Sequence, residues 1–122
     1  MVGIGTWYAM FNVIYDYLYS GTPAGKFAIA EKSAAAVEMA IAGYRGMNIE
    51  LMSPQSRMEV RGILQAQLAT LDVAGAAAND ARSTAMSELS NDNYSNIRLQ
   101  SPALLEKIQT LSTTINGILA QI

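Results

Sequence analysis

The most regular hydrophobic pattern in the chain lies near its C-terminal end. Large aliphatic residues recur there at alternating spacings of four and three, with mostly polar residues between them. This is the a/d spacing of a coiled-coil seam, and it predicts a C-terminal helix. Ser101 and Pro102 predict its start, because serine caps helices and proline is tolerated at the first helical position. The seam consists of Leu104, Ile108, Leu111, Ile115, Ile118 and Ile122.

This seam can pack against another helix of the same chain, or it can join copies of the chain. The two alternatives are compatible, since a helical hairpin can also present a face to a neighbour. A chain this short with several amphipathic helices would leave apolar stripes exposed as a monomer. We therefore expect self-assembly into a homo-oligomer, with the six seam residues at the contact.

The central part of the chain predicts one long helix, from Pro54 to about residue 90. It contains no further proline, and Ser53 can cap its start. At 1.5 Å per residue its length is roughly 55 Å. Residues 74–78 are alanines and one glycine, so we expect a neighbouring backbone to approach closely there. Residues 90–96 are polar and predict a loop. The apolar stripe of the helix is Leu64, Leu68, Leu71, Gly75, Ala78, Ala85 and Leu89.

An earlier amphipathic helix is predicted over residues 26–51, after a hinge at residues 20–25 that holds two glycines and a proline. Gly43 and Gly46 are expected to loosen or kink it. No alternating strand pattern competes with the helices. The expected inner face is Phe27, Ala30, Ala34, Val37, Ile41, Tyr44 and Leu51.

The N-terminal residues differ in kind from the rest, because they hold most of the aromatic side chains and Asp16 is the only charge before Lys26. Residues 2–19 are almost as long as the roughly 20-residue helix that is needed to cross a bilayer. Asp16 and the tyrosines, however, favour a segment that lies at the membrane interface. Burial between subunits is the main alternative, and burial in the core of the same chain is a third. We expect a membrane or subunit contact over residues 1–25 and a helical assembly domain over residues 26–122. The contact residues are Trp7, Tyr8, Phe11, Tyr15 and Tyr19.

The amino-acid composition excludes several kinds of catalytic and binding site. The 122 residues suit one domain, and they include no cysteine and no histidine, which removes thiol and imidazole catalysis and the usual zinc ligands. The net charge of −2 lacks the basic field of a nucleic-acid-binding protein. A GxxG pattern at residues 43–46 lacks the context of a phosphate or RNA site. We expect no enzyme, no cofactor and no metal site.

The centre of the chain resembles the helical region of the small internal core proteins of short-tailed phages, at residues 48–51 (NIEL), 55–57 (QSR) and 85–90 (AMSELS). In that family a hydrophobic N-terminus precedes an alanine- and glutamine-rich body, as here. The resemblance implies a structural virion protein that is ejected ahead of the genome and helps to form an oligomeric channel across the host envelope. It also implies other virion proteins and a lipid bilayer as partners, with DNA only as passing cargo.

A second resemblance comes from residues 9–19, residues 26–28 and the C-terminal residues 117–122 (GILAQI), which are similar to filament and needle subunits of type III secretion. Those proteins also lack cysteine and assemble through terminal helices, which would place this chain in a bacterial surface appendage. Together the observations predict an all-α protein of three to four helices, with one long central helix and a coiled-coil-like C-terminal helix, that works by assembling.

Overall fold

The computed structural model describes residues 22–122, and these residues form three long helices. Helix α2 spans Pro23–Ala42, α3 spans Pro54–Ser87 and α4 spans Ser95–Gln121. Short 3-10 turns, η1 (Ile49–Leu51) and η2 (Asp92–Tyr94), lie in the two connections. The described part is 86% helical and contains no strand, which confirms the all-α class.

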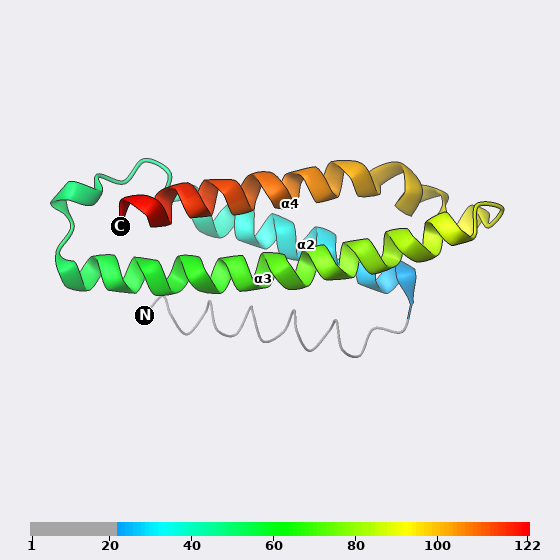
Figure 1. Ribbon diagram of the computed structural model, residues 1–122, viewed down its shortest axis with the longest axis horizontal. Helices are drawn as coiled ribbons and strands as arrows, with labels where there is room; N and C mark the ends of the chain where they lie inside the picture. The colour runs from blue at the N-terminus through cyan, green and yellow to red at the C-terminus, as the bar shows by residue number, and fades with distance from the viewer. Residues whose placement is uncertain (1–21) are drawn as a thin grey trace.

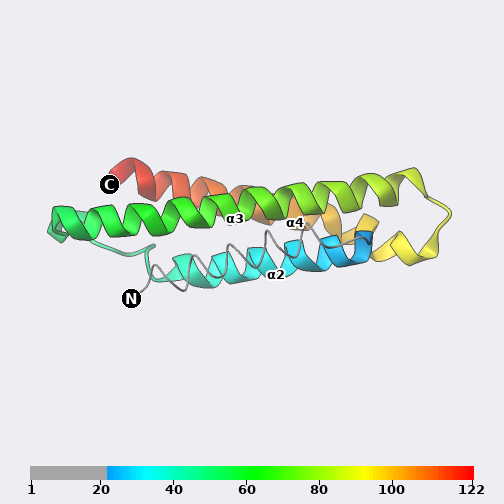
Figure 2. The ribbon, with the colours of Figure 1, turned by 90° about the horizontal axis from the view of Figure 1, so that it is seen from below.

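The three helices form an elongated bundle in which α3 runs antiparallel to both α2 and α4 (Figure 1). Each helix packs against the other two. Figure 2 shows that the α3–α4 turn projects beyond the first residues of α2, so this end of the bundle is a two-helix hairpin. The apolar core follows the bundle axis, because each helix turns one apolar stripe inward.

Helix α2 begins at Pro23 because Thr22 caps it, with the Thr22 Oγ1 accepting a hydrogen bond of 3.0 Å from the Gly25 amide. Its predicted inner face is buried from Phe27 to Ile41. The expected extension to residue 51 is wrong, since α2 ends at Ala42 and Leu51 is 83% exposed. Two glycines within four residues disfavour helix, and the chain must reverse here to enter α3.

Helix α3 starts where the sequence predicts, with Ser53 Oγ accepting from the Ser56 amide at 3.1 Å and Pro54 at the first position. Its 34 residues make it the longest helix, about 51 Å at the usual rise per residue. In the small-residue stretch Ala74, Ala77 and Ala78 are fully buried, while the close approach of a neighbouring backbone stays a prediction. A Cβ on Gly75 would lie 3.9 Å from Ile108 Cγ2, an ordinary van der Waals contact that leaves room for a methyl group.

Helix α4 begins at Ser95, so the predicted start at Ser101-Pro102 is wrong and Pro102 lies inside the helix. Ile97 and Ser101 are buried and extend the four-and-three seam toward the N-terminus by two positions. Burial of this extra turn outweighs the hydrogen bond that proline cannot donate. The Ser101 hydroxyl is buried without a hydrogen-bond partner.

Candidate functional site

The C-terminal seam lies mainly inside the bundle. Leu104, Ile108, Leu111 and Ile115 are buried within the single chain. Ile118 and Ile122 are partly buried and pack against the same core. The structure therefore shows the intrachain alternative for four of the six residues, and their role between copies stays a prediction.

Arg98 is the residue that sequence reasoning missed, because it reads as an isolated surface cation. Its Nη1 donates to the carbonyl oxygens of Ala85, at 3.0 Å, and Glu88, at 3.1 Å, while Nη2 donates to Asn91 at 3.1 Å. The last carbonyls of a helix have no partner within it, and a cation there also interacts favourably with the helix dipole. Arg98 thus holds α4 to the end of α3. The sequence feature that could have predicted this role is a basic residue that follows a helix end and a short polar loop.

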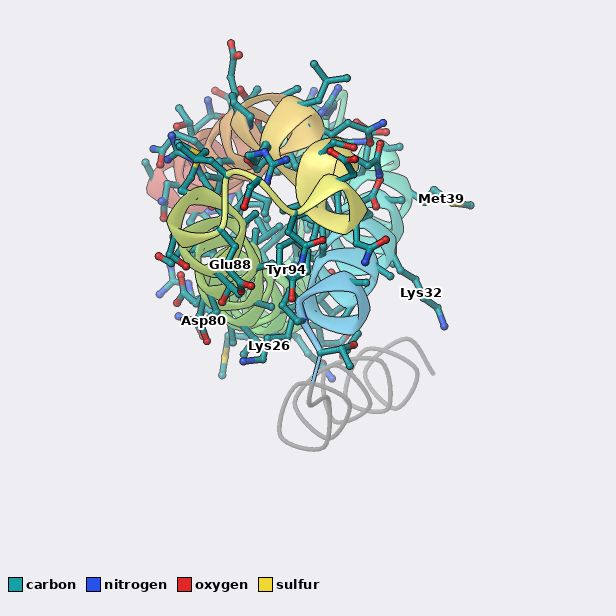
Figure 3. All side chains as sticks on the ribbon, turned by 90° about the vertical axis from the view of Figure 1, so that its right-hand side faces the viewer. Lys26, Lys32, Met39, Asp80, Glu88 and Tyr94 are labelled. Atoms are coloured by element: carbon teal, nitrogen blue, oxygen red, sulfur yellow. The ribbon has the colours of Figure 1, made fainter. Side chains whose placement is uncertain are left out.

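Two ion pairs tie α2 to its neighbours. Lys26 Nζ lies 3.7 Å from Asp80 Oδ2 on α3, and Lys107 Nζ on α4 lies 3.4 Å from Glu38 Oε1. Figure 3 looks along the bundle and shows Lys26 and Asp80 on the same side of it. All four side chains are substantially exposed, so each pair contributes little to stability and mainly favours this arrangement.

A cavity of about 440 Å³ lies between α3 and α4 and is open to solvent. Its polar wall comes from Asp72, Asn79, Gln109 and Ser112, and its floor includes Gly75 and Ile108. One carboxylate with amides and a hydroxyl offers hydrogen bonds but no pair of groups for acid–base work. No group of three or more acidic side chains that could hold a metal ion occurs within residues 22–122.

A second open cavity, of about 650 Å³, lies where the α2–α3 connection meets the C-terminal end of α4. Arg57 reaches into this region, and its Nη2 donates to the Ile49 carbonyl at 3.0 Å. Its Nε is buried without a hydrogen-bond partner. Glu50 and Gln121 also line the cavity. The bond to Ile49 fixes the connection against α3, so Arg57 has a clear structural role.

Large apolar side chains are exposed on the bundle, most of them near its two ends. Leu51 and Met58 lie where α2 connects to α3, with Met58 75% exposed. Met86, Leu89 and Leu99 lie around the α3–α4 turn, with Leu99 79% exposed. Figure 3 shows a sixth such side chain, Met39, pointing outward from α2.

The predicted contact residues Trp7, Tyr8, Phe11, Tyr15 and Tyr19 lie outside the described residues. Within residues 22–122, no helix combines the length and apolar character needed to span a membrane. Comparisons with protein-family models, curated proteins and solved structures find no match to this chain.

Proposed function

We propose that this chain is a structural protein that assembles and contacts a lipid bilayer through its aromatic N-terminal segment. The observation that carries the proposal is the set of exposed apolar side chains at both ends of the bundle, including Leu51, Met58 and Leu99. Exposed apolar groups gathered in this way favour contact with another apolar surface over free solution.

The three-helix bundle has features that suit a structural role. Its core is built from all three helices, and its two cavities are open to solvent. With 15% charged residues, the whole chain gives a surface that can pass DNA without strong retention, because each cationic contact to phosphate adds affinity. These features, with the sequence resemblance, support an internal phage virion protein that helps to form a channel for genome delivery. Its location would then be the virion and afterwards the host envelope.

The test is release of a trapped dye from phosphatidylcholine vesicles by the full chain. We expect release, and we expect Phe11→Asp with Tyr15→Asp to abolish it, because a carboxylate opposes burial among lipid chains. The matched control is Gln65→Glu with Gln100→Glu, which adds two carboxylates at exposed polar positions of the bundle and should retain release. Release should vary little with salt, because apolar burial contributes about 25 cal/mol per Å² and does not depend on screening.

A truncation complements the substitutions. It should end at residue 21, because Thr22 caps α2 and removal of residues 1–25 would also delete the first turn of that helix. Vesicles that stay intact with the full chain contradict the proposal. Intact vesicles together with filaments visible by electron microscopy, lost on the same truncation, would favour the secretion-filament subunit instead.

A further inference from the structure

The connection between α3 and α4 makes few contacts with the rest of the bundle. Residues 88–94 contain neither glycine nor proline. Within residues 22–122 no residue has a positive φ, so this reversal does not use the left-handed residue that often ends a helix. In the connection only Asn91 and Tyr94 are partly buried, and the other side chains are exposed. Straightening the connection would therefore break few packing contacts.

Local hydrogen bonds hold the connection in its folded-back form. The Asn91 amide donates to the Glu88 carbonyl at 3.0 Å, and the Tyr94 amide donates to the Asn91 carbonyl at 3.1 Å. Arg98 on α4 donates to the same two carbonyls, at 3.1 Å in each case. The direction of the chain at this end thus depends on a small set of bonds, two of which come from Arg98.

The contacts that α4 makes with the bundle do not require α4 to belong to the same chain. Its seam from Leu104 to Ile115 packs into the apolar core, and Lys107 pairs with Glu38 on α2. An identical α4 from a second copy would make all of these contacts equally well. Exchange of an identical element between two copies is domain swapping, a route to dimers that needs little new surface.

Exposed apolar side chains at this end favour a second copy as the partner. Met86, Leu89 and Leu99 lie around the α3–α4 turn and are exposed. After an exchange, each chain runs from the end of its own α3 to the start of α4 in the other bundle, so the two turn ends face each other. The apolar side chains of both copies then meet at this junction and lose contact with water. Figure 2 shows that α2 stops short of the turn and leaves it accessible.

Charge does not oppose this junction. The turn end carries two carboxylates and two guanidinium groups, from Glu88, Asp92, Arg82 and Arg98. Farther along the bundle, Lys26 and Asp80 pair with each other. Because the two signs balance, two copies of this end do not repel each other strongly.

We propose that two copies of this chain exchange α4 by straightening residues 88–94, so that each bundle holds α2 and α3 of one chain and α4 of the other. These seven residues, fully extended, reach about 23 Å, well beyond the roughly 8–10 Å between packed helix axes. In dilute solution the chain's own α4 is favoured, because its effective concentration is of order millimolar. The exchange rests on the self-assembly in the proposed function and not on its contact with lipid.

The two ion pairs provide a test in the unsubstituted full chain, because a carbodiimide joins a lysine amine directly to a neighbouring carboxylate. Equal amounts of isotope-labelled and unlabelled chain are unfolded together, refolded at about 1 mM or about 10 µM, cross-linked and analysed by mass spectrometry. At the higher concentration we expect a dimer by light scattering and mixed-label peptides that join Glu38 to Lys107. Peptides that join Lys26 to Asp80 are the internal control and should carry a single label, since α2 and α3 stay in one chain.

Substitutions at the turn should shift the dimer fraction at equal protein concentration. Arg98→Ala should raise it severalfold, because Arg98 holds the folded-back connection, whereas Arg82→Ala is the matched control on the exposed side of α3. Leu89→Gln with Leu99→Gln should lower it, since both side chains lie at the junction. The control for this pair is Leu51→Gln with Met58→Gln at the opposite end of the bundle, which should leave the fraction unchanged. Circular dichroism confirms that each variant is folded.

Three outcomes overturn the exchange. A dimer whose Glu38–Lys107 peptides all carry a single label assembles through another surface, so the proposed function survives. A monomer at both concentrations contradicts the exchange and also the self-assembly of the free protein. Mixed labels on both kinds of peptide indicate contacts between unexchanged bundles. Dye release from vesicles is measured separately, so its failure contradicts the proposed membrane contact and leaves the exchange standing.

Discussion

Substitution of Arg98 by alanine should destabilise the bundle more than any other change at a charged residue. The guanidinium donates three hydrogen bonds to carbonyl oxygens at the α3–α4 turn, at 3.0 to 3.1 Å. A hydrogen bond from a charged group contributes about 1.5–3 kcal/mol when buried, and exposure lowers this value. Two of the three bonds are partly buried and the third is exposed. We therefore expect a total loss of about 2 kcal/mol.

The assay is chemical and thermal unfolding followed by circular dichroism. A loss of 2 kcal/mol in a domain of this size should lower Tm by roughly 10 °C. The denaturant midpoint should fall without a change in slope, because the surface exposed on unfolding is unchanged. Arg98→Lys should recover only the interaction with the helix dipole, about 0.3–1 kcal/mol, since lysine lacks the planar fork.

Arg82→Ala is the matched control, because Arg82 is exposed on the same end of α3. It should change stability by less than about 0.5 kcal/mol. If Arg98→Ala and Arg82→Ala unfold at the same denaturant concentration, the carbonyl contacts contribute nothing measurable and the reasoning is refuted.

Three further predictions concern the helices, and each is checked by the same unfolding measurements. Pro102→Ala should raise stability by about 1–3 kcal/mol, because Pro102 is exposed inside α4 and alanine restores a backbone donor; a destabilised variant would show that proline stabilises the start of α4. Gly75→Ala should raise stability by about 0.5–1 kcal/mol, since its Cβ meets Ile108 at 3.9 Å; a loss would show that α3 and α4 pack too tightly for a methyl group. Ile115→Ala should cost about 2–5 kcal/mol in a single chain, because Ile115 is fully buried; an unchanged unfolding curve with loss of oligomers would place it at an interface between copies.

Local signals in the sequence predict the helices and the start of α3, whereas α2 begins at Pro23, inside the segment expected to be a hinge. Thr22 and Ser53 cap α2 and α3 beside a proline, and this combination needs no tertiary partner. The four-and-three spacing of α4 likewise predicts which side of that helix is buried, because only those positions share one face. Helix type and inward face are therefore readable from spacing alone.

Tertiary structure decided where the other boundaries fall and what the apolar faces contact. Ser101-Pro102 carries a start signal, yet α4 begins more than one turn earlier, because Ile97 is buried in the core and Arg98 donates to carbonyl oxygens at the end of α3. The spacing of the seam from Leu104 to Ile115 is equally compatible with packing between two chains and with packing inside one chain. It is buried within one chain because α2 and α3 already lie beside it, and a covalently connected partner is present at high effective concentration. Spacing specifies a face, whereas the partner of that face depends on which helices the connections bring alongside it.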